Sequence, residues 1–239
     1  MKTIGLLGGM SWESTVSYYR LINEAVRERL GGLHSARCVL YSVDFAEVEA
    51  LQSAGRWAEA TGLLLTAARG LEAAGADFVL ICTNTMHKVA DAIEAEAGLS
   101  LLHIADATGA ALQAAGVSCV GLLGTRFTMD DESIVSARLR RQGGIEVLAP
   151  DPADRDEVHR VIFDELCRGV IDDRSRATYV AVIERLRERG AQGVILGCTE
   201  IALLIDAAIS PLPVFDSTAL HAAAAAEWML QDPSTGDGP

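Results

Sequence analysis

Two halves of the chain repeat one pattern, and in each half the pattern ends in a cysteine. Residues 4–8 (IGLLG) recur at 120–124 (VGLLG), residues 78–83 (FVLICT) at 194–199 (VILGCT), and residues 104–108 (IADAT) at 214–218 (VFDST). The same 78 positions separate Ile4 from Cys82 and Val120 from Cys198. Self-similarity at one fixed spacing predicts two copies of one structural unit. If the copies face each other across a cleft, one thiol lies on each side of a bound ligand.

The repeat alone indicates fold rather than chemistry, because doubly wound α/β folds often contain two similar halves. Free cysteine is also commonly buried as a small hydrophobic residue. That interpretation suits Cys38 and Cys119, which lie in strand-like runs, and Cys167, which lies in a helical one. Cys82 and Cys198 differ, since each ends an apolar run and precedes a threonine. We interpret this pair as catalytic, because two acid/base groups on opposite faces of one carbon suit inversion of its configuration.

Short apolar runs, typical of buried parallel strands, alternate with helical periodicity along the chain. Strands are predicted at 3–7, 38–43, 78–81, 118–123, 145–148, 193–196 and 213–215, with 101–104 as a shorter candidate, and helices at 15–30, 57–74, 84–97, 107–115, 129–142, 155–168, 174–189 and from Ser217. This alternation predicts an α/β fold of two pseudo-symmetric lobes, each a parallel sheet flanked by helices, with the active site in the cleft between them. We expect the first lobe at 1–105 with the C-terminal helix 215–230, the second at 106–214, and a disordered tail at 231–239.

Composition disfavours several classes of protein. Half of the 239 residues are hydrophobic, yet no apolar run has membrane-spanning length, and the N-terminus enters a predicted strand without a signal peptide. The five cysteines lack CxxC spacing, which indicates neither a disulfide framework nor a zinc site. A net charge of −13 disfavours nucleic acid and anionic membranes as partners, whereas a local cluster of N–H groups can still bind an anionic small molecule. We therefore expect a cytoplasmic protein with a small-molecule ligand.

Each paired cysteine falls where a strand gives way to a predicted helix. The unpaired N–H groups and positive dipole end of a helix N-terminus lower the pKa of a cysteine toward neutrality. Polar residues follow both cysteines and can cap these helices, bind a ligand carboxylate, or do both. They are Thr83, Asn84, Thr85 and Thr199.

A glycine loop, Gly8-Gly9-Met10-Ser11, follows the first strand and matches neither GxGxxG nor the Walker pattern. Its glycines permit N–H groups to approach an anion closely. Gly124 and Thr125 repeat this loop beside the second cysteine, so we expect two N–H pockets to flank one cleft, with Thr125 and Thr128 as further donors.

Three more residues each have two interpretations. His87 and His221 either tune the site or are satisfied histidines at the surface of their helices. Glu200 either holds a substrate amino group or favours a helix N-terminus.

These motifs resemble the aspartate/glutamate racemase family, most closely its broad-specificity amino-acid racemase branch. The resemblance covers nearly the whole chain and rests on residues 4–15 (IGLLGGMSWEST), 82–87 (CTNTMH), 163–166 (FDEL), 197–200 (GCTE) and 215–221 (FDSTALH). It implies a cofactor-independent enzyme of amino-acid metabolism, often dimeric, so a homodimer is expected. The family's catalytic cysteines match Cys82 and Cys198: one thiolate removes the α-proton while the opposite thiol protonates the other face.

The resemblance also implies which groups bind the substrate and stabilise the planar carbanion. They are Gly9, Met10, Ser11, Thr83, Asn84, Thr85, Thr125, Thr199 and Glu200. Because Lys2 and Lys88 are the only lysines, a pyridoxal phosphate enzyme is an unattractive alternative. Family members dedicated to aspartate carry an Arg at about 44–51 and a Lys near Cys167. Here the first stretch lacks a base and the second reads Leu166-Cys167-Arg168, so acidic and neutral substrates both stay open, with Arg168 or Arg126 as candidate substitutes.

Other functions remain alternatives. Maleate isomerases and hydantoin racemases of the same superfamily also keep two thiols, but lack this form of the first loop. A malonate-type decarboxylase needs only one proton donor, so the matched cysteines count against it. A non-catalytic amino-acid sensor would be stabilised by its ligand without turnover.

Overall fold

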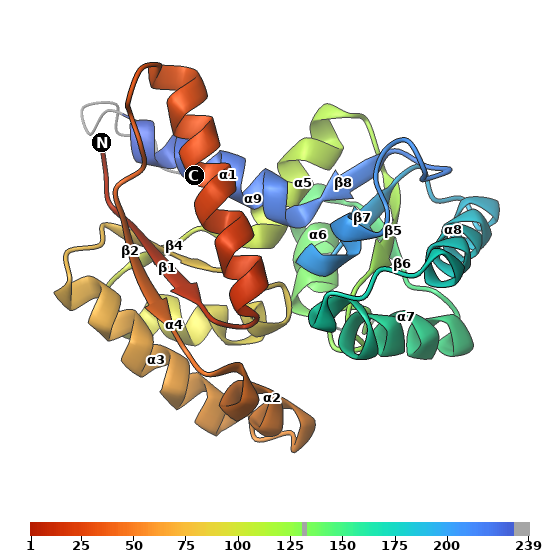
Figure 1. The fold of residues 1–239 in the computed structure, drawn as a ribbon, viewed down its shortest axis with the longest axis horizontal. Coiled ribbons are helices and arrows are strands. Elements are labelled where there is room, and N and C mark those ends of the chain that lie inside the picture. Colours follow the sequence, from red (N-terminus) through yellow and green to blue (C-terminus); the bar gives the residue numbers. More distant parts are fainter. Residues whose placement is uncertain (131–132, 232–239) are drawn as a thin grey trace. The chain divides into compact units, whose positions relative to one another are not determined.

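The computed structural model describes residues 1–130 and 133–231, whose elements are labelled in Figure 1. In chain order they are β1 (Ile4–Gly8), α1 (Trp12–Leu30), β2 (Cys38–Ser42), α2 (Phe45–Ser53), α3 (Trp57–Ala73), β3 (Phe78–Ile81), η1 (Thr85–Val89), α4 (Ala90–Glu96), β4 (Ser100–Leu101), α5 (Ile104–Ala114), β5 (Cys119–Leu123), α6 (Ile134–Gly143), β6 (Glu146–Leu148), α7 (Pro152–Asp164), η2 (Leu166–Arg168), α8 (Asp173–Glu188), β7 (Val194–Leu196), η3 (Thr199–Leu203), β8 (Val214–Asp216) and α9 (Ser217–Leu230). The η elements are 3-10 helices.

The strands form two four-stranded sheets, and every described pairing is parallel. The strand orders are β2-β1-β3-β4 and β6-β5-β7-β8, so the two sheets share one topology. The α/β class with two equivalent parallel sheets flanked by helices is therefore confirmed. Crossover connections of this kind join parallel strands through helices.

The chain divides into two compact units. One contains Met1–Cys82, Val89–Leu102 and the chain from His221 onward, and the other contains Thr83–Lys88 and His103–Leu220. These units differ from the lobes expected at 1–105 with 215–230 and at 106–214: the segment after Cys82 belongs to the second unit, and so does β8, which pairs with β7. Of the expected tail at 231–239, all but Gln231 lies outside the described residues.

In the first unit, alternate side chains of the strands enter different layers, as the two-residue period of a strand requires. Ile4, Leu6, Phe78 and Leu80 pack with residues of α1 and of α9 in one buried cluster. On the other face Gly5 lies against α3, where an added Cβ would stand 3.3 Å from Leu71 Cβ. Figure 1 shows α1 and α3 running beside the strands of this unit. The sheet is thus covered by helices on both faces, which explains its continuous apolar strands.

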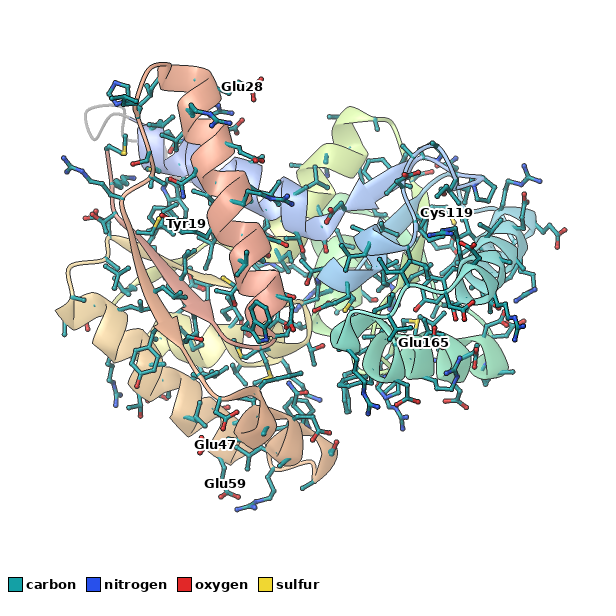
Figure 2. The ribbon with its side chains drawn as sticks, in the orientation of Figure 1. Tyr19, Glu28, Glu47, Glu59, Cys119 and Glu165 are labelled. Carbon is teal, nitrogen blue, oxygen red and sulfur yellow. The ribbon has the colours of Figure 1, made fainter. Side chains whose placement is uncertain are left out.

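The second unit repeats this arrangement. Leu123, Val194 and Leu196 pack with residues of α7 and α8, whereas Val120, Leu122 and Ile195 pack with residues of α5 and α6. The two clusters lie on opposite faces of one sheet because the residues alternate along β5 and β7. Cys119 lies at the start of β5 (Figure 2), and Cys38 and Cys167 lie in β2 and η2, which confirms the strand and helical positions expected for them.

The structure differs from the predicted elements at several places. The helix α2 was not predicted, because its only buried residues are Val48 and Gln52 and its apolar periodicity is correspondingly weak. The helix expected at 84–97 is divided into η1 and α4. The third sequence echo is not a structural one, since residues 104–108 lie in α5 whereas Val214–Asp216 forms β8.

Among the described residues, none of the helices has the length and apolarity needed to cross a bilayer. In the same part of the chain, no three His, Cys, Asp or Glu side chains gather where they could hold a metal ion.

Candidate active site

Cys82 directly follows β3, belongs to the first unit and is fully buried. Its N–H donates to the Leu7 carbonyl at 3.0 Å and so extends the β1–β3 ladder by one residue. Burial raises the pKa of this thiol, and the neighbouring Cys38 raises it further. The predicted lowering by a helix N-terminus is wrong here, because the next helical element is only a 3-10 turn and desolvation dominates. At rest, Cys82 is a protonated thiol.

The polar groups of the glycine loop make hydrogen bonds to the loop itself and to the first turn of α1. The N–H of Gly9 donates to Thr15 Oγ1 at 2.8 Å, and the Thr15 hydroxyl donates to the Ser11 carbonyl at 2.9 Å. The Ser11 hydroxyl caps α1 by accepting from the N–H of Ser14. The Gly9 N–H expected in an anion pocket is thus bonded to a side chain in the first turn of α1. The substrate-binding roles of Gly9, Met10 and Ser11 stay predictions.

Asn84 belongs to the second unit and is 5 % exposed. The Ser217 hydroxyl donates its one proton to the Leu196 carbonyl at 2.8 Å, so it can only accept from Asn84 Nδ2, which lies at 3.0 Å. This contact fixes the orientation of the amide and leaves Oδ1 without a hydrogen-bond partner among the described residues. A buried acceptor without a donor costs about 1–3 kcal/mol. A ligand that brings an N–H or O–H donor to Oδ1 removes that cost.

Threonine hydroxyls gather beside Asn84. Thr85 Oγ1 lies 3.1 Å from Thr125 Oγ1 and 3.2 Å from Thr128 Oγ1. The structure therefore brings together Thr85 and Thr125, which lie 40 positions apart. A cavity of about 320 Å³ within the second unit is lined by Asn84, Thr85, Thr128 and Lys88, and by apolar side chains at the start of α6. Hydroxyl donors, a buried acceptor, the cation of Lys88 and the carboxylate of Asp130 thus surround one space.

His87 of the second unit and His221 of the first unit are both fully buried, so their interpretation as surface histidines is wrong. The N–H of Ile104 donates to His87 Nε2 at 3.1 Å, which requires that Nδ1 carries the proton donated to the Thr83 carbonyl at 2.7 Å. His221 donates from Nε2 to a backbone carbonyl at 2.8 Å and accepts at Nδ1 from the Tyr18 hydroxyl at 2.8 Å. His87 thereby ties the turn after Cys82 to the start of α5.

Cys198 lies two residues beyond β7 in the second unit and is partly exposed. Its thiol donates to Oε2 of Glu200 at 2.9 Å, and the Thr199 hydroxyl donates to the same oxygen at 3.2 Å. Burial first, and then the charge of Glu200, raise the pKa of Cys198 well above its ordinary value. The predicted lowering is wrong for this thiol too, and no side chain caps η3.

The hydrogen-bond registers of the two sheets differ by one residue at the strand ends that precede the cysteines. In the first sheet the Leu7 carbonyl accepts from the N–H of Cys82, whereas in the second the equivalent Leu123 carbonyl accepts from Gly197 at 2.6 Å. Glycine permits this approach, because an added Cβ would stand 2.8 Å from that carbonyl oxygen. Cys198 consequently leaves its sheet one residue later than Cys82 does.

The sequence comparison agrees with this arrangement. Residues 7–225 match the Asp/Glu/Hydantoin racemase family. The chain belongs to this family. A candidate Asp/Glu racemase from Yersinia pestis is 55% identical, with a TM-score of 0.90 and with 97% of this chain and 100% of that chain covered. An aspartate racemase homologue from Pyrococcus horikoshii OT3 is 33% identical, with a TM-score of 0.84 and the same coverage.

A more distant structure, the aspartate racemase of Picrophilus torridus, shares the fold of this racemase-family chain at 22% identity, with a TM-score of 0.73 and 95% of each chain covered. Sequence reasoning missed several residues of the candidate site, among them Ser217 and Lys88 and the cavity-lining residues at 127, 130 and 133–135. Ser217 orients Asn84, and Lys88 lines the cavity. Ser217 lies within the family motif 215–221, and Lys88 directly follows the motif 82–87, so both motifs pointed to these positions.

Proposed function

We propose that this racemase-family protein is a cofactor-independent amino-acid racemase that inverts the α-carbon through Cys82 and Cys198. One observation carries the proposal: a cysteine follows the equivalent strand, β3 or β7, in each of two sheets of identical topology. Membership of the family supports racemase chemistry. The homodimer and the cytoplasmic location stay expectations.

Inversion needs one thiolate and one thiol at opposite faces of the α-carbon. The thiolate takes the α-proton, so the C–H bond breaks, an S–H bond forms, and the electron pair remains on a planar carbanion. The opposite thiol then gives its proton to the other face and becomes the thiolate. One negative charge thus passes from one sulfur to the other, and the reverse reaction exchanges the roles of the two cysteines.

Polar groups of the second unit suit the charges of an amino acid. In this proposal Asn84 Oδ1 accepts a hydrogen bond from the substrate ammonium group. The hydroxyls of Thr85, Thr125 and Thr128 donate to its carboxylate, where negative charge grows as the carbanion forms. Donors that are already oriented toward that charge stabilise the carbanion more than the ground state.

The assignment to Asn84 predicts a specific defect. Asn84→Leu removes the acceptor at similar volume, and we expect kcat/KM for racemisation to fall about 10- to 100-fold, since a hydrogen bond to a charged group contributes roughly 1.5–3 kcal/mol. Thermal stability should change little, because leucine also removes a buried acceptor without a donor. Ser217→Ala keeps Oδ1 and loosens only its orientation, so its loss should be smaller. An unchanged kcat/KM in Asn84→Leu would exclude this role.

The function itself is tested by chiral chromatography of the wild-type protein with a panel of L- and D-amino acids and no added cofactor. Interconversion is the expected result, and the ranking of acidic against neutral side chains identifies the substrate class. Ligand-induced stabilisation without interconversion would instead indicate an amino-acid sensor, and activity on maleate or hydantoins would indicate the corresponding relatives.

A further inference from the structure

The two thiols have different neighbours, and the difference falls at equivalent positions of the repeat. Residue 84 follows the first cysteine by two positions, as residue 200 follows the second, but the first is asparagine and the second glutamate. Glu200 is 4 % exposed, and its Oε2 accepts the S–H of Cys198 at 2.9 Å. Asn84 instead donates to Ser217. Among the described residues, this position therefore supplies a carboxylate in contact with the thiol in the second half of the repeat, and an amide in the first.

We propose that Glu200 is the proton acceptor of Cys198 and so prepares this thiol to act as the base. The catalytic consequence rests on the proposed racemase function, whereas the proton transfer does not. In the transfer, the S–H bond breaks, an O–H bond forms on Oε2, and Cys198 becomes a thiolate beside a neutral carboxylic acid. The pair carries one negative charge before and after the step.

The charge balance explains why a carboxylate is useful here. If Cys198 lost its proton to solvent, a thiolate and a carboxylate would stand side by side in a buried place, which like-charge repulsion and desolvation both oppose. Transfer within the pair avoids the second charge. The Thr199 hydroxyl is a second donor to the same oxygen, at 3.2 Å.

Among the described residues, Cys167 of η2 and Tyr179 of α8 also interact electrostatically with Cys198. The Tyr179 hydroxyl donates to the Val158 carbonyl at 2.8 Å, and burial raises the pKa of this phenol. Burial thus keeps Tyr179 protonated. Glu200 is accordingly the group placed to receive the proton of Cys198.

The proposal predicts an unusual pH dependence of thiol reactivity. Carbamidomethylation of Cys198 by iodoacetamide is measured between pH 6 and pH 8 from the mass spectrum of its peptide. In the wild type the rate should change less than about threefold, because a pair that shares one proton holds a constant fraction of thiolate. In Glu200→Gln the thiol titrates alone, so its rate should rise about tenfold per pH unit, or about 100-fold over this range.

Thr199→Val is the matched control, because it removes the second donor to Oε2 and keeps the carboxylate, so the flat profile should persist. A wild-type rate that rises in parallel with that of Glu200→Gln would overturn the proposal. If Glu200→Gln does not fold, Glu200→Asp withdraws the carboxylate from the sulfur at constant charge, and a rising profile is again expected.

Catalysis supplies the second readout. In the direction in which Cys198 removes the α-proton, Glu200→Gln should lower kcat about 10²-fold or more with KM changed less than about threefold. A flat wild-type profile in a protein without racemase activity would refute the proposed function alone. Racemase activity with parallel profiles would refute the role of Glu200 alone.

Discussion

Serine in place of either paired cysteine is expected to lower the racemisation rate by about 10²–10⁴-fold, the range that a positioned acid or base contributes. The hydroxyl nearly preserves the shape of the thiol, so Cys82→Ser and Cys198→Ser should fold normally. A hydroxyl is a much weaker acid than a thiol, and an alkoxide is inaccessible near neutral pH. Each variant therefore lacks one of the two groups that inversion needs. Racemisation is measured by chiral chromatography of initial rates.

The two serine variants should also differ from each other. Cys82→Ser keeps the hydrogen-bonded pair of Cys198 and Glu200, so it should still exchange the α-proton of one enantiomer with D₂O without inverting it. Cys119→Ser is the control, because this cysteine lies at the far end of β5 from Gly124, and full activity is expected. Full racemisation by either Cys82→Ser or Cys198→Ser would contradict the two-thiol mechanism.

The largest effect on stability is expected from Gly9→Ala. Gly9 has a φ of +92°, and an added Cβ would stand 2.2 Å from the carbonyl oxygen of Val43 and 2.6 Å from its nitrogen. These are backbone atoms, so they cannot turn away as a side chain would. Conformational strain of about 1–2 kcal/mol and overpacking of about 1–3 kcal/mol both act at this position. We expect a loss of roughly 2–5 kcal/mol in the free energy of unfolding.

Gly75→Ala provides the comparison that separates these two causes. Gly75 has a similar φ of +88°, but an added Cβ would meet no atom within 4 Å. Only the conformational strain remains, so the free energy of unfolding, measured by urea denaturation, should fall by about 1–2 kcal/mol. Equal losses in the two variants would show that the approach of Gly9 to Val43 does not constrain the loop.

The sheets were the most predictable part of the molecule. β3 was predicted without error at Phe78–Ile81, because both faces of its sheet are covered by helices and its residues are apolar without interruption. The start of α6 was predicted five residues early, at Met129, whereas the helix begins after Ser133, whose hydroxyl caps it by accepting from the N–H of Ser136. Helix α2 was not predicted at all, because it buries few residues and its apolar periodicity is therefore weak.

The site was predictable in its residue types and less so in its contacts. Matched cysteines and the polar residues after them could be recognised from spacing, but the ionisation of the thiols could not. The rule for helix N-termini failed because Cys82 is buried and the element after it is a short 3-10 helix. The contact between Cys198 and Glu200 depends on how η3 begins, which residue spacing does not determine. Long-range contacts such as that of Asn84 with Ser217 require the fold itself.

One measurement tests the central claim most directly. A single enantiomer of the substrate identified by the amino-acid panel is incubated in D₂O. At low conversion the two enantiomers are separated, and the deuterium content of each is measured by mass spectrometry. The two-thiol mechanism predicts one deuterium at the α-carbon of the inverted product and none in the remaining substrate, because different groups remove and deliver the proton. Deuterium in both enantiomers from the start, or inversion without deuterium, would contradict it.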